Sequence, residues 1–152
     1  MLFTRRDLPH IQRDTRALFV TFMLKAGRTL TPQMRDIVLD HCLHDHGKRY
    51  DLHAAVIMST HVHLLFSPRL AESGEVYLLS KIMQGIKGSS SRSINKLMRN
   101  AGPVWRDESF DHVVRSDADF ENHFIYIFEN AFSVSGSGNP YDYPWLWTPG
   151  ER

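Results

Sequence analysis

The segment over residues 61–66 (HVHLLF) constrains the fold of this chain most, because its alternation fits a β-strand that is covered on one face. In a strand, successive side chains point to opposite faces of the sheet. Val62, Leu64 and Phe66 then share an apolar face that can pack under helices, and the two histidines share the opposite face. Two imidazoles at positions i and i+2 on a rigid strand can reach one cation with little further loss of conformational entropy. The segment predicts a strand and makes His61 and His63 candidate metal ligands, although such a pair alone also occurs without a metal.

The remaining apolar and capping patterns predict an α+β order of elements. In chain order, the predicted elements are a strand over 17–24, a helix from Pro32 that stops at Gly47, strands over 52–58 and 61–66, a helix over 75–99, short extended segments over 104–106 and 110–115, and a helix that opens at Ser116. Gly88 and the three serines after it are able to bend or interrupt the long helix. The order suggests an antiparallel sheet with its helices packed on one face.

Composition excludes several classes of protein. The chain has 152 residues, with 18 basic and 17 acidic side chains and a formal net charge of +1. This length is within the usual range for one domain, roughly 100–200 residues, so we expect a single domain over residues 1–152. The lone Cys42 excludes an internal disulfide. The longest apolar run, residues 17–24, is too short to span a bilayer, and the N-terminus lacks an export signal. We expect a cytoplasmic protein without a membrane partner.

The predicted last helix carries a tyrosine outside its apolar stripe. The stripe consists of Phe120, Phe124, Ile127, Phe128 and Ala131. Asn122, Tyr126 and Asn130 are spaced i, i+4 and i+8, which places them on a separate polar ridge. A phenol is a poor nucleophile near pH 7 because its pKa is about 10, so a metal ion or a nearby base has to assist it. The side-chain oxygen of Asn130 can reach the same ion as His61 and His63. Tyr126 is therefore our candidate nucleophile.

Basic residues without any acidic neighbour occupy the predicted long helix. They are Lys81, Lys87, Arg92, Lys96 and Arg99. On a continuous helix, all of them except Lys87 fall close together, opposite the apolar side. Ordinary solvated faces mix both signs of charge, whereas a ridge of one sign suits phosphates. The stretch therefore predicts contacts with nucleic acid.

Taken together, these segments resemble the single-tyrosine HUH transposases, and most closely the REP-associated tyrosine transposases of bacteria. The resemblance is carried by residues 49–54 (RYDLHA), 56–65 (VIMSTHVHLL), 102–105 (GPVW), 110–115 (FDHVVR) and 126–130 (YIFEN). It implies a ferredoxin-like or RRM-like α+β domain, with the histidine motif on a central strand and the catalytic tyrosine on a C-terminal helix. Two departures concern the site: Ser59-Thr60 replaces the usual Pro-Asn, and Asn130-Ala131 replaces the usual Asn-Pro.

The resemblance also implies a chemistry. His61 and His63 would bind a divalent ion, magnesium or manganese, with Asn130 as a third ligand. Tyr126 would attack single-stranded DNA near a hairpin, such as a palindromic repeat, to give a 5′-phosphotyrosine link and a free 3′-hydroxyl. A strand joined in this way can be transferred to another end without ATP.

Two alternatives stay open at this stage. The chain could bind DNA hairpins without cutting them, or it could be a metal-dependent phosphodiester hydrolase in which water attacks. Whether the protein acts as a monomer or a homodimer, and so whether the active site forms in cis or in trans, is undecided from the sequence.

Overall fold

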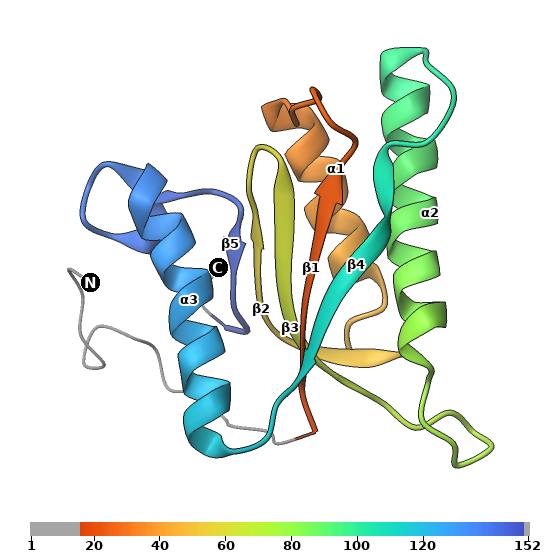
Figure 1. Ribbon diagram of the computed structural model, residues 1–152, viewed down its shortest axis with the longest axis vertical. Helices are drawn as coiled ribbons and strands as arrows, with labels where there is room; N and C mark the ends of the chain where they lie inside the picture. The colour runs from red at the N-terminus through yellow and green to blue at the C-terminus, as the bar shows by residue number, and fades with distance from the viewer. Residues whose placement is uncertain (1–15, 151–152) are drawn as a thin grey trace.

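The computed structural model describes residues 16–150, which fold into one β-sheet with helices on both of its faces (Figure 1). In this part of the chain, the elements are β1 (Leu18–Leu24), α1 (Pro32–His44), β2 (Tyr50–Ile57), β3 (His61–Pro68), α2 (Leu79–Met98), β4 (Trp105–Val113), α3 (Asp117–Ser135), a short 3-10 helix η2 (Pro140–Asp142) and β5 (Leu146–Trp147). The five strands form one sheet in the order β4-β1-β3-β2-β5. Every neighbouring pair is antiparallel, and β3 lies in the centre.

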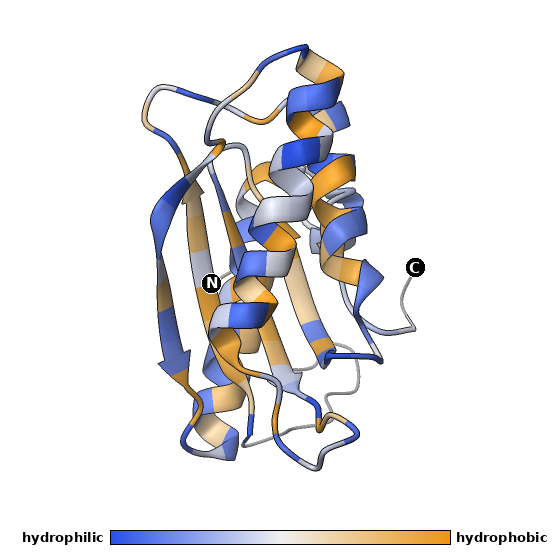
Figure 2. Cartoon of the chain, turned by 90° about the vertical axis from the view of Figure 1, so that its right-hand side faces the viewer, coloured by the Kyte–Doolittle hydropathy of each residue, from blue (hydrophilic) through white to orange (hydrophobic). Residues whose placement is uncertain are grey.

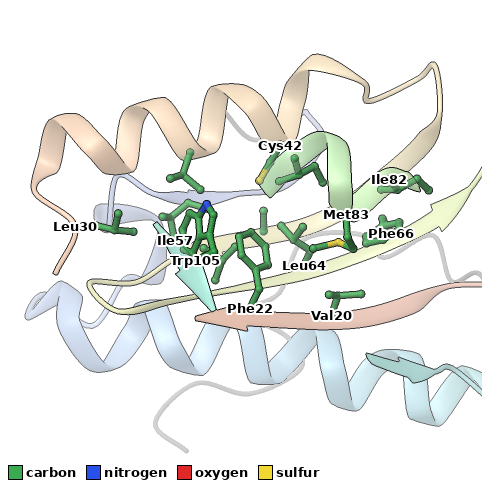
Figure 3. Close-up of a cluster of buried hydrophobic side chains, with 14 of the residues drawn as sticks. Val20, Phe22, Leu30, Cys42, Ile57, Leu64, Phe66, Ile82, Met83 and Trp105 are labelled. Atoms are coloured by element: carbon green, nitrogen blue, oxygen red, sulfur yellow. The ribbon is translucent and has the colours of Figure 1, made fainter. Parts of the chain in front are cut away.

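The face of the sheet under α1 and α2 holds the larger apolar cluster. Phe22 of β1, with Leu64 and Phe66 of β3, is fully buried there against residues such as Val38 of α1 and Ile82 of α2. These strand residues follow the alternation expected for one covered face. Figure 3 shows part of this cluster between the strands and α1, with α3 on the far side of the sheet.

Helix α3 packs on the opposite face, so the prediction that all helices share one face is wrong. A second apolar cluster joins Ala54, Val56 and Leu65 of the sheet to Phe124 and Phe128 of α3. The reason is visible in the second half of β2, residues 54–57, which are all apolar and all buried. A strand that is apolar on both faces needs a cover on both. The α+β class and the antiparallel sheet are as expected.

Strand β4 is one edge strand, although the sequence suggested two short extended segments around a turn. It pairs with β1 only, and its register shifts between Phe22 and Leu24. Most of its residues are exposed, and Figure 2 shows the hydrophilic colouring of this edge. An exposed edge strand needs no apolar alternation, so the apolar pattern of the sequence did not indicate that β4 is one continuous strand.

Helix α2 runs without a break through Gly88 and the serines that follow it. Ser90 is fully buried and donates its hydroxyl to the carbonyl oxygen of Ile86, 2.7 Å away. The same hydroxyl oxygen accepts the indole N–H of Trp105 at 2.9 Å. Because Ser90 satisfies both a helix carbonyl and a core tryptophan, it holds α2 against β4 rather than interrupting the helix.

Helix α3 begins and ends with recognisable caps. The Ser116 side chain accepts a hydrogen bond from the backbone N–H of Asp119, and Gly136 takes the left-handed conformation at the C-terminus, with φ of 73°. Ala131 lies inside the helix, where a proline would remove a hydrogen bond and clash with the preceding turn. The alanine therefore lets α3 continue past Asn130 to Ser135. Across residues 16–150, no helix combines the length and apolarity that a membrane span requires.

Candidate active site

Strand β3 directs its two histidines toward the α3 side of the sheet. Val62, between them, belongs to the apolar cluster on the other side. The ring centroids of His61 and His63 are 4.8 Å apart. The pair is therefore held by the central strand of the sheet, which fixes the separation of the two imidazoles.

His63 has the environment of a neutral ligand. It is 4% exposed, and its Nδ1 lies 2.7 Å from the hydroxyl oxygen of Thr21, which stands opposite it on β1. Its Nε2 is buried with no hydrogen-bond partner in the described part of the chain. Burial, and secondarily the nearby His61, lower the pKa of His63 to about 4. At neutral pH the ring is uncharged. In the tautomer whose Nδ1 proton is donated to Thr21, a lone pair remains on Nε2, as in metal-bound histidines.

His61 contacts the C-terminal half of α3. Burial lowers the pKa of His61, and a side-chain hydrogen bond with Asn130 partly opposes that shift. The Asn130 amide nitrogen donates to the backbone carbonyl of Tyr126 at 2.9 Å. This bond leaves the amide oxygen of Asn130 to accept from His61. Two imidazoles and one amide oxygen thus converge from β3 and α3, and this donor set fits a divalent metal ion.

Tyr126 lies against the same histidine pair. Its ring centroid is 5.1 Å from that of His63 and 5.9 Å from that of Phe19. The residue is 48% exposed, so one side of the ring packs and the rest is open to solvent. The structure therefore brings together the four residues that the sequence analysis singled out for chemistry: His61, His63, Tyr126 and Asn130.

A cavity of about 500 Å³ opens beside Tyr126 on this face of the sheet. Its lining is Phe19, Thr21, His63, Phe110, Asn122, His123 and Tyr126. Phe110 stands opposite Thr21 on β4 and is 63% exposed. Helix α3 packs over β2 and β3, and most residues of β4 are exposed, so the cavity lies at the margin between covered and uncovered sheet. A substrate can approach from the β4 side.

Three residues of this cavity wall were not predicted from the sequence. Phe19 and Thr21 come from the first strand, and Phe110 comes from the edge strand. Their positions depend on strand register, which pairs Thr21 with both His63 and Phe110. The alternation of the strand over 17–24 indicated that Phe19 and Thr21 share a face. The alternation did not indicate which face of the sheet Phe19 and Thr21 occupy, or which residues they contact there.

The basic residues of α2 are not part of this cluster. Lys81, Arg92, Lys96 and Arg99 are all exposed, while the buried side of α2 contacts the sheet face opposite α3. Lys87 differs from them, because its ammonium donates to the backbone carbonyls of Arg106 and Asp107, at 2.6 and 3.2 Å. Burial lowers the pKa of Lys87, against the opposing effect of Asp107. Lys87 therefore joins α2 to β4.

The sequence matches the profile of a known family. Residues 24–127, more than half of the chain, match the family described as IS200-like transposases, and the chain belongs to this family. The matched range includes His61, His63 and Tyr126. The protein is thus a transposase-type enzyme with a role in DNA processing. A search of curated proteins gives no significant match.

Two solved structures share the fold. A REP-associated tyrosine transposase bound to a REP hairpin superposes with a TM-score of 0.65 and 18% identity, over 91% of this chain and 82% of that one. A candidate transposase from Deinococcus radiodurans R1 gives a TM-score of 0.52 and 16% identity, over 75% of this chain and 88% of that one. The chain therefore has the α+β fold of a REP-associated tyrosine transposase.

Proposed function

We propose that this chain is a metal-dependent endonuclease and strand transferase that cuts single-stranded DNA near a hairpin through Tyr126. The observation that carries the proposal is the packing of the Tyr126 ring against His63, whose buried Nε2 lacks a hydrogen-bond partner within residues 16–150. A phenol beside a preformed cation site has the assistance that its high pKa requires. Family membership supports DNA as the substrate, and the hairpin in the similar structure supports a hairpin neighbouring the cut.

His61, His63 and Asn130 would hold the ion. Imidazole is a softer ligand than oxygen, and magnesium prefers an all-oxygen shell, so we propose manganese or magnesium, with manganese the better match of the two. When bound, the ion polarises the scissile phosphate and stabilises the charge that develops on it. The nucleophile is supplied by the protein, and the leaving 3′-oxygen is supplied by the DNA.

The proposed attack balances without a further reactant. The Tyr126 oxygen forms a bond to phosphorus and gives up its proton to water. The bond from phosphorus to the 3′-oxygen breaks, and that oxygen takes up a proton to become a 3′-hydroxyl. The product is a 5′-phosphotyrosine link that preserves the energy of the phosphodiester bond. Attack by another 3′-hydroxyl reverses the step and joins two strands.

The position of the cavity suggests how the DNA lies. The single strand would enter over the open face of β4, where an unpaired base can stack on the exposed ring of Phe110. The outward-facing basic residues of α2 lie on the other side of the sheet, so they would contact a different part of the substrate. We assign them to phosphates of the hairpin stem.

The cluster also bears on oligomeric state. Tyr126 and both histidines meet within one chain, so we propose that the site works in cis and that residues 16–150 act as one domain. Mixing Tyr126→Phe with His63→Gln protein tests this directly. A site that works in cis gives no adduct from the mixture, whereas shared sites restore part of it.

The proposal is tested with labelled hairpin DNA that carries a single-stranded flank. Incubation with manganese should yield a protein–DNA adduct that survives denaturation. Tyr126→Phe should abolish it, and Tyr77→Phe is the matched control, because Tyr77 packs against the α1/α2 cluster. Cleavage that persists in Tyr126→Phe without an adduct would instead favour a hydrolase that uses water. Hairpin binding with no cleavage in any metal would favour a binding module.

A further inference from the structure

A second group of metal-ligating side chains lies beside the candidate active site. His112 comes from β4, while Asp119 and His123 come from the first turns of α3 and are spaced i, i+4. One ligand atom from each of the three residues lies within 4.8 Å of the others. The proposed reaction assigns no role to this group, although His123 also lines the cavity beside Tyr126.

The three side chains already converge. His112 Nε2 is 2.8 Å from one carboxylate oxygen of Asp119, and His123 Nδ1 is 3.2 Å from the other. The two imidazole rings stack, with centroids 4.7 Å apart and an angle of 27° between their planes. The side chains are 42%, 22% and 21% exposed for His112, Asp119 and His123, so an ion in solution can reach them.

We propose that His112, Asp119 and His123 bind a divalent transition-metal ion of the zinc type. Two imidazoles and one carboxylate are a common three-ligand set for zinc, with the remaining position left to water or substrate. Tetrahedral zinc needs its ligand atoms about 3.3 Å apart, given bond lengths near 2.0 Å. The two histidine–carboxylate separations, 2.8 and 3.2 Å, are near this value, and all three ligand atoms lie within 4.8 Å of one another, so rotation of the partly exposed side chains can close the difference.

This site differs in charge from the one formed by His61, His63 and Asn130. The ligands of the first site are all neutral, whereas Asp119 supplies a carboxylate. A negative ligand strengthens attraction for a divalent ion, so zinc should occupy the second site at lower concentration. The two sites flank a single ring, because the Phe19 centroid is 4.6 Å from His123 and 5.5 Å from His63.

The consequence for the fold is a metal link between the edge strand and α3. Asp119 already accepts the backbone N–H of Arg115 at 2.9 Å, just before the helix begins. An ion shared with His112 would fasten the first turns of α3 to β4, and Tyr126 lies one turn beyond His123 on the same helix. The link would hold the helix that presents the tyrosine.

Metal titration without DNA tests this site independently of the proposed catalysis. The protein is stripped with EDTA and titrated with cobalt, which reports zinc-type sites through its visible absorption. Wild type should bind two equivalents, and the His61→Ala/His63→Ala variant should keep the tighter one. Adding His112→Ala and His123→Ala should remove it. His44→Ala is the matched control, because His44 is an exposed histidine that pairs with Asp45 outside either group.

A measurement on the unaltered chain guards against variants that fail to fold. Zinc added to wild-type protein should shift the imidazole ¹⁵N resonances of His112 and His123 at the first equivalent. Binding that leaves these two resonances unmoved, or a His61→Ala/His63→Ala protein that folds and takes up no cobalt, would show that the group only caps α3. Both measurements use no DNA, so a protein that fails to cleave DNA would still give a clear result in each.

Discussion

The two faces of the sheet differ in what the same strands bury. Beneath α1 and α2, β1 and β3 contribute Phe22 and Leu64 to a dry apolar cluster. Beneath and beside α3, the alternate residues of those strands are Thr21 and His63, which bond to each other next to Tyr126. The α1/α2 face therefore holds the larger apolar cluster, whereas the α3 face holds polar groups in fixed positions beside its own, smaller apolar cluster. Two strands can serve both purposes because their side chains alternate.

The largest expected effect is on the polar face. Replacing His63 with Gln removes the buried nitrogen that is directed at the proposed ion, so adduct formation with manganese should fall more than about 100-fold. The free energy of unfolding should change little by comparison. A gel for the covalent adduct, together with urea denaturation, measures both. His53→Gln is the control, because His53 lies on β2 and is hydrogen-bonded to Ser67. An equal loss of adduct in His53→Gln would show that the effect is not specific to His63.

The matching change on the apolar face should act on stability alone. Leu64 is fully buried, so Leu64→Ala should lower the free energy of unfolding by about 2–5 kcal/mol. At a temperature where the variant stays folded, it should still form the adduct. Urea denaturation gives the first quantity and the adduct gel the second. A folded Leu64→Ala protein without activity would mean that the two faces are not independent.

Acid should weaken the polar face in particular. Burial lowers the pKa of His63 to about 4 from an ordinary value near 6.5. Between these two pH values, His63 is protonated in the unfolded chain and neutral in the folded chain. The contribution of neutral His63 to the free energy of unfolding is therefore full above pH 6.5, and it decreases by roughly 1–3 kcal/mol as the pH falls toward 4. Denaturation in EDTA across this range measures the slope. The His63→Gln variant should show a shallower slope, and an unchanged one would assign the effect to other groups.

The smallest expected effects concern α2. Arg92 and Lys96 are exposed, so changing each to Ala should weaken hairpin binding a few-fold and reduce its dependence on salt by about one ion. Lys87→Met should leave that salt dependence nearly unchanged, because the Lys87 ammonium already binds carbonyls of β4. Fluorescence anisotropy at several salt concentrations separates the two. A larger change for Lys87 would place the DNA in a cavity between α2 and β4, which Gln84, Lys87 and Arg106 help to line.

Local patterns predicted much of the fold. The alternation around Leu64 identified β3 and its apolar face, and the capping pattern at Ser116 located the start of α3. The pairing of β4 with β1 was not predictable from these patterns, because an edge strand carries charges where a covered strand carries apolar residues. Nor did they show that α3 crosses to the other face, since a helical stripe specifies that a face is buried but not against which side of a sheet.

The candidate site divides in the same way. The spacing of Tyr126 and Asn130 on a helix, and of the two histidines on a strand, depends only on local geometry and was predicted. The contact of Asn130 with His61, and of Thr21 with His63, depends on how distant segments pair. Lys87 was grouped with the other basic residues because charge alone does not reveal a partly buried side chain whose ammonium binds backbone carbonyls.

The most direct test of the central claim is to locate the covalent bond. Wild-type protein is incubated with manganese and a hairpin that carries a single-stranded flank, then digested with protease and nuclease and analysed by mass spectrometry. We expect a nucleotide phosphate on the peptide that contains Tyr126, with a new 3′-hydroxyl on the released DNA. Attachment at another tyrosine, or cleaved DNA with unmodified protein, would contradict it.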